Sequence, residues 1–156
     1  MMQPLILCLG NEIISDDGFG PYVAELLQAD DRLNGKAEVI SACTAGFGLI
    51  DILAGRDRVL IVDIIRTGNV PAGAVHQFPA GQLAPSRYLT TSHQINLPTA
   101  LELGRQMGVI MPKSVDVIAV EGEDMETLRV GLTPAVQNAV APTIELIHKW
   151  VTDSSW

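Results

Sequence analysis

The chain has 156 residues and is 47% hydrophobic, so it is long enough to bury an apolar core without disulfide bonds. A net charge of -8 with only 10 Lys and Arg residues argues against nucleic acid and against an anionic membrane surface as partners. Two cysteines cannot form a disulfide framework, and no charged leader or long apolar span opens the sequence, so we expect a reducing, cytoplasmic location.

The first part of the chain alternates buried strands with amphipathic helices. Leu5 to Leu9 form a continuous apolar run, which is typical of a strand buried on both faces. Apolar residues then recur at helical spacing after a polar turn, in which Asp16 or Asp17 could cap the first helix. The predicted elements, in the order β, α, β, α, β, cover residues 5–9, 18–28, 37–41, 44–54 and 59–63. This alternation indicates a parallel, doubly wound sheet.

The next strand is predicted at residues 73–78, and it differs from the others in its connection. The chain from Asp63 to this strand is short and rich in turn residues, including Gly68, Asn69 and Pro71. No crossover helix fits in such a connection, so we predict that this strand is antiparallel and lies at an edge of the sheet.

A third helix is predicted from an apolar face that precedes the last strand. Pro98 would clash deeper in a helix, so we place it in the first turn and place His93 just before the helix. A final buried strand covers residues 115–120. The apolar face of the helix consists of Leu97, Ala100, Leu101, Gly104 and Met107.

The last helix is predicted to open with Thr133 as N-cap and Pro134 as the first helical residue. Pro142 falls inside its apolar stripe and should kink it. The stripe consists of Val136, Val140, Ile144, Ile147 and Val151. Together the elements predict an α/β fold, a three-layer sandwich with a twisted, mostly parallel sheet, one antiparallel edge strand and helices on both faces. No repeat or linker composition is present, so we expect one domain over residues 1–156.

Polar side chains follow the predicted parallel strands, where ligands of open sheets bind. Asp16 and Asp17 follow the first strand, and Asp63 ends the third. His93 can reach the same edge because it precedes a helix packed on the sheet. Carboxylates and an imidazole from separate loops make an oxygen and nitrogen ligand set that leaves coordination positions open on a divalent ion.

Each of these candidates also has a structural interpretation. Asp16 and Asp17 before a helix are most often a cap and a complement to the helix dipole. Asp63 is as easily a loop cap as a functional group, and His93 could be a hydrogen-bonded surface side chain. The sequence contains neither His-Glu-x-x-His nor Cys-x-x-Cys, so spacing by itself is weak evidence for a metal site.

Other residues are weaker candidates. His76 on the edge strand and His148 in the last helix are predicted to be solvated rather than metal ligands. Cys8 and Cys43 are both predicted to be buried thiols, and Thr44 fits a helix cap. The glycines complete neither a dinucleotide-binding nor a P-loop fingerprint, so no nucleotide or flavin cofactor is expected.

The run LGNEIISDDGFG, from Leu9 to Gly20, resembles the amino-terminal signature of the hydrogenase maturation endopeptidases, which reads Gly-Asn, four residues, Asp-Asp-Gly-x-Gly. Further segments match the family in the same order, so the resemblance spans nearly the whole chain. They are Thr44-Ala45-Gly46, Val62-Asp63, Ser92-His93 and Gly131-Leu132-Thr133-Pro134-Ala135-Val136. The sequence departs from the family at Cys8, at Glu12 and at residues 41–43, where relatives often have Asp-Gly-Gly.

This resemblance implies an α/β sandwich with aspartic-type endopeptidase activity. Members of the family remove a short C-terminal extension from the large-subunit precursor of nickel-iron hydrogenase after nickel insertion. The resemblance implies that Asp17, Asp63 and His93 are both the catalytic and the metal-contacting residues. We interpret this trio as a docking point for nickel presented by the precursor, with Asp16 as the helix cap. We expect a monomer whose partner is the hydrogenase large-subunit precursor.

Two other functions are compatible with the same residues. A non-cleaving module that binds a nickel protein is suggested by the lack of an evident nucleophile or general base in the sequence. A small-molecule metallohydrolase would need a deep apolar pocket at the trio. Cleavage of a precursor separates the endopeptidase from the first alternative, and the shape of the cleft separates it from the second.

Overall fold

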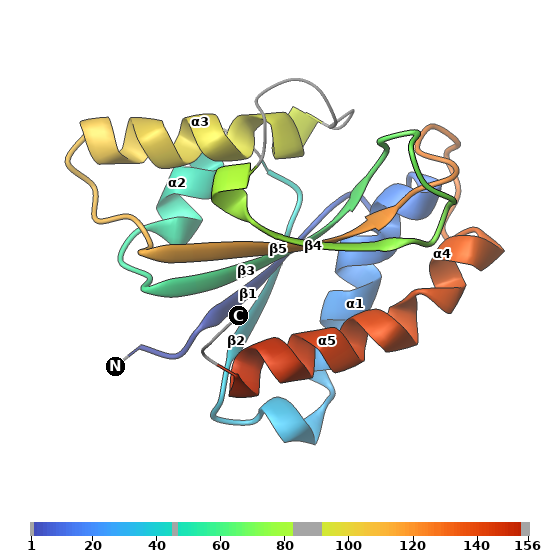
Figure 1. Ribbon diagram of the computed structural model, residues 1–156, viewed down its shortest axis with the longest axis horizontal. Helices are drawn as coiled ribbons and strands as arrows, with labels where there is room; N and C mark the ends of the chain where they lie inside the picture. Colours follow the sequence, from blue (N-terminus) through green and yellow to red (C-terminus); the bar gives the residue numbers. More distant parts are fainter. Residues whose placement is uncertain (1, 45–46, 83–91, 154–156) are drawn as a thin grey trace.

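The computed structural model describes residues 2–44, 47–82 and 92–153, without the side chains at positions 47, 82 and 92–96. Within these residues a five-stranded sheet carries helices on both faces, as Figure 1 shows. The strands are β1 Leu5–Leu9, β2 Glu38–Ala42, β3 Arg58–Ile65, β4 Val75–Pro79 and β5 Ser114–Glu121. The helices are α1 Phe19–Gln28, α2 Phe47–Leu53, α3 Ser92–Gln106, α4 Pro134–Asn138 and α5 Val140–Thr152. Short 3-10 turns occur at η1 Ser15–Gly18, η2 Asp31–Leu33 and η3 Ala80–Gln82.

The strand order across the sheet is β2-β1-β3-β5-β4. β1 is parallel to β2 and β3, β3 is parallel to β5, and β4 is antiparallel to β5. The predicted fold class, including the antiparallel edge strand, is therefore confirmed. The chain runs outward from β1 to β2 and then returns to β3 on the other side of β1. The strand order thus reverses between β1 and β3, which is the place where open α/β sheets bind ligands.

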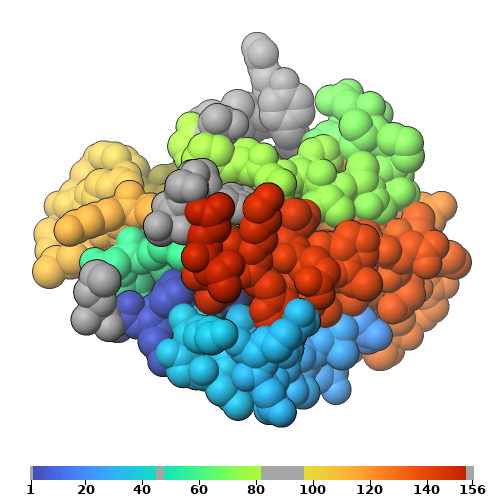
Figure 2. Space-filling view, turned by 60° about the horizontal axis from the view of Figure 1, so that its bottom comes forward, coloured from blue at the N-terminus to red at the C-terminus, as the bar shows by residue number. Residues whose placement is uncertain are grey.

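The two faces of the sheet bury separate apolar clusters, because successive side chains of a strand point to opposite faces. Leu5, Leu7 and Leu9 of β1 join the cluster under α2 and α3. Ile6 and Cys8 join the cluster under α1 and α5. Figure 2 shows α5, in red, and α1, in blue, side by side on one face of the molecule. Burial on both faces explains why β1 has a continuous apolar sequence rather than an alternating one.

The start of α1 packs directly on the end of β1, and this contact requires a glycine. A Cβ at Gly20 would lie 2.1 Å from the carbonyl oxygen of Leu9. That distance is far below van der Waals contact, and the clashing atom belongs to the backbone, so a side chain at position 20 would displace the helix. Gly20 therefore fixes how closely the first helix approaches the carboxyl end of β1.

The third helix begins earlier than predicted. Pro98 lies inside α3 rather than in its first turn, so His93 is the second residue of the helix and not the residue before it. Proline removes one backbone donor from a helix interior, which normally destabilises it. Here the buried side chains Leu97, Ala100 and Leu101 pack against the cluster under α2 and offset that loss.

The ends of the remaining helices agree only in part with the predictions. Met107, predicted to extend the buried face of α3, follows the helix end and is 56% exposed, because Gly108 turns the chain with a φ of 79°. Thr133 and Pro134 take the predicted N-cap and first helical positions. The predicted kink near Pro142 is a break between α4 and α5, which leaves the proline in the first turn of α5. No helix in the described ranges is both long and apolar enough to cross a membrane.

We expect Gly20→Ala to lower the free energy of unfolding by about 1–3 kcal/mol, because the added methyl overpacks the contact with Leu9. Urea denaturation followed by circular dichroism measures the change. Gly81→Ala is the matched control, since a Cβ there would meet no atom of the described residues within 4 Å. Equal losses for the two variants would contradict this explanation of Gly20.

Candidate active site

Asp17 lies in η1, directly after β1, and the turn around it depends on Gly10. Gly10 has a φ of 148°, and a Cβ there would lie 2.0 Å from the backbone oxygen of Asp17. Because glycine lacks that Cβ, the Asn11 N–H can donate to both the backbone oxygen and Oδ2 of Asp17, each at 3.1 Å. Asp17 is consequently held at the carboxyl end of β1 with only 8% of its surface exposed.

Asp63 lies inside β3 rather than at its end, because the strand continues to Ile65 alongside β5. The pairing of β1 with β3 extends only as far as Val62, so Asp63 is level with the end of β1. Its side chain is fully buried, and Oδ1 accepts a hydrogen bond from the Ile64 N–H at 2.7 Å. η1 lies against β3, with Cα atoms within 8 Å. Asp17 and Asp63 therefore come from neighbouring elements at the point where the strand order reverses.

His93 belongs to the first turn of α3, and its side chain is outside the described part of the structure. Figure 1 shows that the amino end of α3 lies toward the carboxyl ends of the parallel strands. Among the described side chains, no group of three or more His, Cys, Asp and Glu could hold a metal ion, and that set does not include His93. The metal-contacting role of Asp17, Asp63 and His93 thus stays a prediction.

Asp16 is not the helix cap that the sequence predicted. The N-cap of α1 is Gly18, without a side-chain hydrogen bond. The buried carboxylate of Asp16 instead accepts the backbone N–H groups of Glu123 at 2.9 Å, Asp124 at 2.8 Å and Thr133 at 2.8 Å. The Thr133 hydroxyl donates to the same carboxylate, at 3.0 and 2.9 Å from its two oxygens. Asp16 therefore joins η1 to the loop between β5 and α4.

A further buried carboxylate, Glu121 at the end of β5, was not predicted from the sequence. It accepts hydrogen bonds from the Thr67 hydroxyl at 2.6 Å, from the N–H groups of Thr67 and Gly68, and contacts His76 Nε2 at 3.2 Å. Burial raises the pKa of the Glu121 carboxyl, but these donors outweigh burial and leave the pKa below its usual value. Its position after a buried apolar strand, like that of Asp63, is the signal that could have identified it.

His76 and His148, predicted to be solvated, are only partly exposed, because each meets a carboxylate that is distant in sequence. His76 contacts Glu121 as described above. His148 Nε2 lies 2.7 Å from Asp30 Oδ2, with 14% of its side chain exposed. Hydrogen bonds from Arg32, together with the one from His148, hold the pKa of Asp30 well below its usual range. This pair connects α5 to the segment after α1, away from the candidate site.

The two cysteines differ in exposure. Cys8 is fully buried, as predicted, and burial followed by the charge of Asp63 raises the pKa of its thiol far above neutral pH. It is therefore a packed side chain and not a nucleophile. Cys43 was predicted to be buried but is exposed. It lines a cavity of about 290 Å³ beside the turn that carries Asp17, together with Gly10, Asn11, Glu12, Pro21, Ser41 and Ala42.

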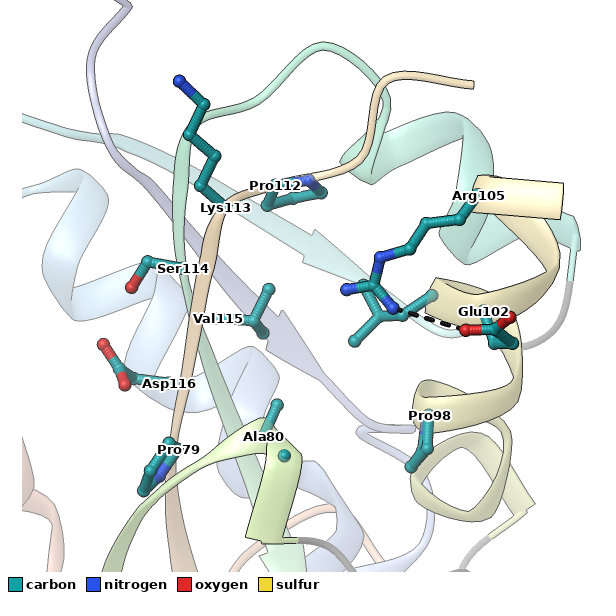
Figure 3. A pocket seen from close by; sticks show the side chains of 12 residues that line it. Pro79, Ala80, Pro98, Glu102, Arg105, Pro112, Lys113, Ser114, Val115 and Asp116 are labelled. Carbon is teal, nitrogen blue, oxygen red and sulfur yellow. Dashed lines mark ion pairs between the residues drawn. The ribbon is translucent and has the colours of Figure 1, made fainter. Parts of the chain in front are cut away.

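A larger cavity, about 480 Å³, lies at the opposite edge of the sheet, near the amino end of β5. Figure 3 shows Val115 of β5, Ala80 and Pro98 around it, with Glu102 and Arg105 of α3 forming an ion pair at 3.7 Å across its rim. This cavity is separated from Asp17 and Asp63 by the length of the strands, so it is not part of the candidate active site.

The chain is similar to a known family and to known structures. A family model described as hydrogenase maturation protease matches residues 21–150. The hydrogenase 2 maturation protease of Escherichia coli is 29% identical over 154 residues, which cover 94% of this chain and 88% of that protein. The structure of a hydrogenase maturating endopeptidase from Escherichia coli has a TM-score of 0.82 and 26% identity, covering 99% and 94% of the two chains. A NiFe hydrogenase maturation protease from Thermococcus kodakarensis shares the fold, with a TM-score of 0.76, 22% identity, and coverage of 96% and 99%.

We expect Thr133→Val to lower the free energy of unfolding by about 1–3 kcal/mol, because the buried Asp16 carboxylate loses its hydroxyl donor. Urea denaturation measures the loss. Thr152→Val is the control, since that exposed hydroxyl donates to carbonyls of its own helix and its loss should change stability by less than about 0.5 kcal/mol. Equal effects at the two positions would contradict the role assigned to Asp16.

We expect Glu121 to contribute stability that depends on pH. Because its pKa in the folded protein is below the usual 4.5, its contribution is present above that value and is lost as the pH falls through the folded pKa. Glu121→Gln should therefore cost more stability at pH 7 than below about pH 4. Urea denaturation at both pH values tests this, with the exposed Glu102→Gln as control. A cost for Glu121→Gln that is independent of pH would be inconsistent with a charged, hydrogen-bonded carboxylate.

Proposed function

The chain belongs to the hydrogenase maturation protease family, and on this premise we propose that it removes the C-terminal extension of a nickel-loaded hydrogenase large-subunit precursor. Membership of the family makes the chain a peptide-bond hydrolase. One observation carries the choice of site, namely that Asp17, in the turn after β1, and Asp63, in β3 level with the end of β1, are buried carboxylates on neighbouring elements. The same two positions match the ordered segments that resemble the family.

We propose that Asp17, Asp63 and His93 recognise nickel held by the precursor. Carboxylate oxygens and an imidazole nitrogen suit a divalent first-row metal. A divalent cation that reaches both carboxylates is attracted by the negative charge of each. Three ligands from the protease leave coordination positions for the precursor's own groups. Nickel is then part of the substrate and not a resident cofactor.

Cleavage adds water across one peptide bond, which leaves a new carboxylate on the large subunit and a free amino group on the released extension. The carboxylate of Asp17 or Asp63 can accept a proton from the attacking water, and the resulting carboxylic acid can return it to the leaving amine. Backbone N–H groups of Asn11 and Ile64 donate to these carboxylates and hold their orientation. This scheme requires no nucleophilic thiol, in agreement with the raised pKa of Cys8.

The shape of the surface near Asp17 favours a protein substrate over a small molecule. The cavity beside this turn has a volume of about 290 Å³, at the lower limit of typical small-molecule pockets. Its walls include backbone of the loops that follow β1 and β2, and Cys43 is exposed there. A peptide segment of a larger protein fits such a site better than an enclosed apolar ligand does.

We further propose that the protein acts as a monomer in the cytoplasm. Cys8 and Cys43 are both free thiols, which is the state that a reducing compartment maintains. Sedimentation velocity tests the oligomeric state, and fractionation of cells that express the protein tests the location.

We expect Asp17→Asn, Asp63→Asn and His93→Ala each to reduce cleavage of nickel-loaded precursor by about 100-fold or more, because each removes a ligand or proton acceptor. Mass spectrometry of precursor incubated with the protease, with and without nickel, measures the product. Cleavage should also require nickel in the precursor.

Matched controls keep this experiment specific. Asp51→Asn removes an exposed carboxylate in α2, and His148→Gln alters a histidine away from the site while keeping a hydrogen-bonding group. Both controls should cleave at the wild-type rate. Wild-type cleavage by Asp63→Asn or His93→Ala would remove those residues from the site, and tight binding of an uncut precursor would favour a non-cleaving nickel-protein module.

A further inference from the structure

Two loops at the carboxyl edge of the sheet are joined by an isolated parallel bridge between Ile14 and Arg129. The Arg129 N–H donates to the Ile13 carbonyl at 2.9 Å, and the Ser15 N–H donates to the Arg129 carbonyl at 2.8 Å. Figure 1 shows the loop after β5, in orange, beside the turn after β1, in blue. Residues far apart in the sequence thus form one continuous surface.

This surface displays large apolar side chains to solvent. Leu128 and Val130 are each 77% exposed, and Ile13 is 51% exposed. The bridge brings these three residues to one part of the surface, because each is next in sequence to Ile14 or Arg129. We call Ile13, Leu128 and Val130 the apolar patch. Clustered exposed apolar side chains of this size are typical of interaction sites.

The loops under the apolar patch are held in place by hydrogen bonds. The Asp16 carboxylate binds the backbone at both ends of the loop after β5, through Glu123, Asp124 and Thr133. The Asp124 carboxylate also accepts the N–H groups of Glu126 and Thr127, at 3.1 and 3.0 Å. The patch is therefore presented by an ordered surface, so a partner binds it without a large cost for ordering the loop.

The apolar patch is continuous with the candidate active site. The turn that carries Asp17 also carries Ile13, and Asn11 donates to Asp17 while its side-chain oxygen accepts the Ile13 N–H at 3.2 Å. A protein whose peptide bond lies at Asp17 is therefore next to these loops. The same bound protein can therefore contact both Asp17 and the apolar patch.

The charges around the apolar patch define the chemistry of its partner. Glu12, Glu123 and Glu126 are exposed carboxylates in the same two loops, and Arg129 is the single basic side chain there. The Arg129 guanidinium donates to the Ser15 hydroxyl at 2.9 Å. An apolar centre with an acidic rim is complementary to an apolar segment flanked by Lys or Arg.

We propose that Ile13, Leu128 and Val130 form the docking surface for the hydrogenase large-subunit precursor, through an apolar, basic-flanked segment of that protein. This proposal rests on the proposed function. Docking at the patch supplies affinity, while Asp17, Asp63 and His93 act on the nickel and the peptide bond. Changes at the patch should therefore alter binding of the precursor and leave the chemical step unchanged.

The test uses the double variant Leu128→Ser/Val130→Ser and the control Ile110→Ser, whose side chain is also 77% exposed but lies between α3 and β5. We expect the double variant to raise both KM for cleavage and Kd for nickel-loaded precursor about tenfold, with kcat within about twofold of wild type. Ile110→Ser should change neither constant.

A second pair of variants tests the acidic rim. Glu126→Lys should raise KM and weaken the dependence of binding on salt, whereas Glu102→Lys on α3 should not, because Glu102 is remote from the patch. If Glu126→Lys binds the precursor as the wild type does, the proposal that Lys or Arg residues flank the bound segment is wrong.

The outcomes separate the docking proposal from the proposed function. Normal cleavage with an unchanged KM in the double variant would overturn only the docking surface. Binding that depends on the patch without any cleavage would overturn only the proposed cleavage. Sedimentation velocity tests whether a second copy of this chain binds the patch instead. A dimer that forms with the wild-type protein but not with the double variant would assign the patch to that contact. Wild-type protein that neither binds nor cleaves the nickel-loaded precursor would overturn both.

Discussion

The carboxylate of Asp16 is buried where three backbone N–H groups and one hydroxyl converge on it. Burying a carboxylate is costly unless such donors replace water, and removing a donor leaves part of that cost uncompensated. These bonds connect the turn after β1 to the loop after β5 and to Thr133 at the start of α4. Together with the backbone hydrogen bonds of the Ile14–Arg129 bridge, this side chain fixes the positions of Asp17 and the apolar patch relative to each other.

The two adjacent aspartates have different tasks because successive positions in a tight turn point in different directions. Asp16 turns toward the β5 to α4 loop, while Asp17 remains against Asn11 at the end of β1. Gly10 and Gly20 make this possible, since a Cβ at either would collide with backbone oxygen at about 2 Å. A short, rigid turn thus serves as structural anchor, candidate active site and edge of a docking surface.

The proposed recognition of a precursor uses two surfaces of this arrangement. In that proposal, the candidate nickel-contacting residues select a loaded precursor, because an empty one offers no cation to the two carboxylates. The apolar patch with its acidic rim is proposed to supply affinity for the surrounding protein. Since both surfaces are built on loops joined through Asp16, a bound precursor is oriented with respect to Asp17 and Asp63 without movement of the sheet.

Several features were determined by the sequence alone. Continuous apolar runs predicted the buried strands, and the short connection after Asp63 predicted the antiparallel edge strand, because both depend on local pattern and chain length. Strand-end placement and the ordered motifs identified Asp17 and Asp63 as candidates. Tertiary structure decided the partners of the polar groups, since donors and acceptors distant in sequence leave no local pattern. In the folded protein, Asp16 accepts hydrogen bonds from a loop distant in sequence, and Glu121 contacts His76. Pro98 lies inside a helix that is stabilised by burial of its apolar side chains.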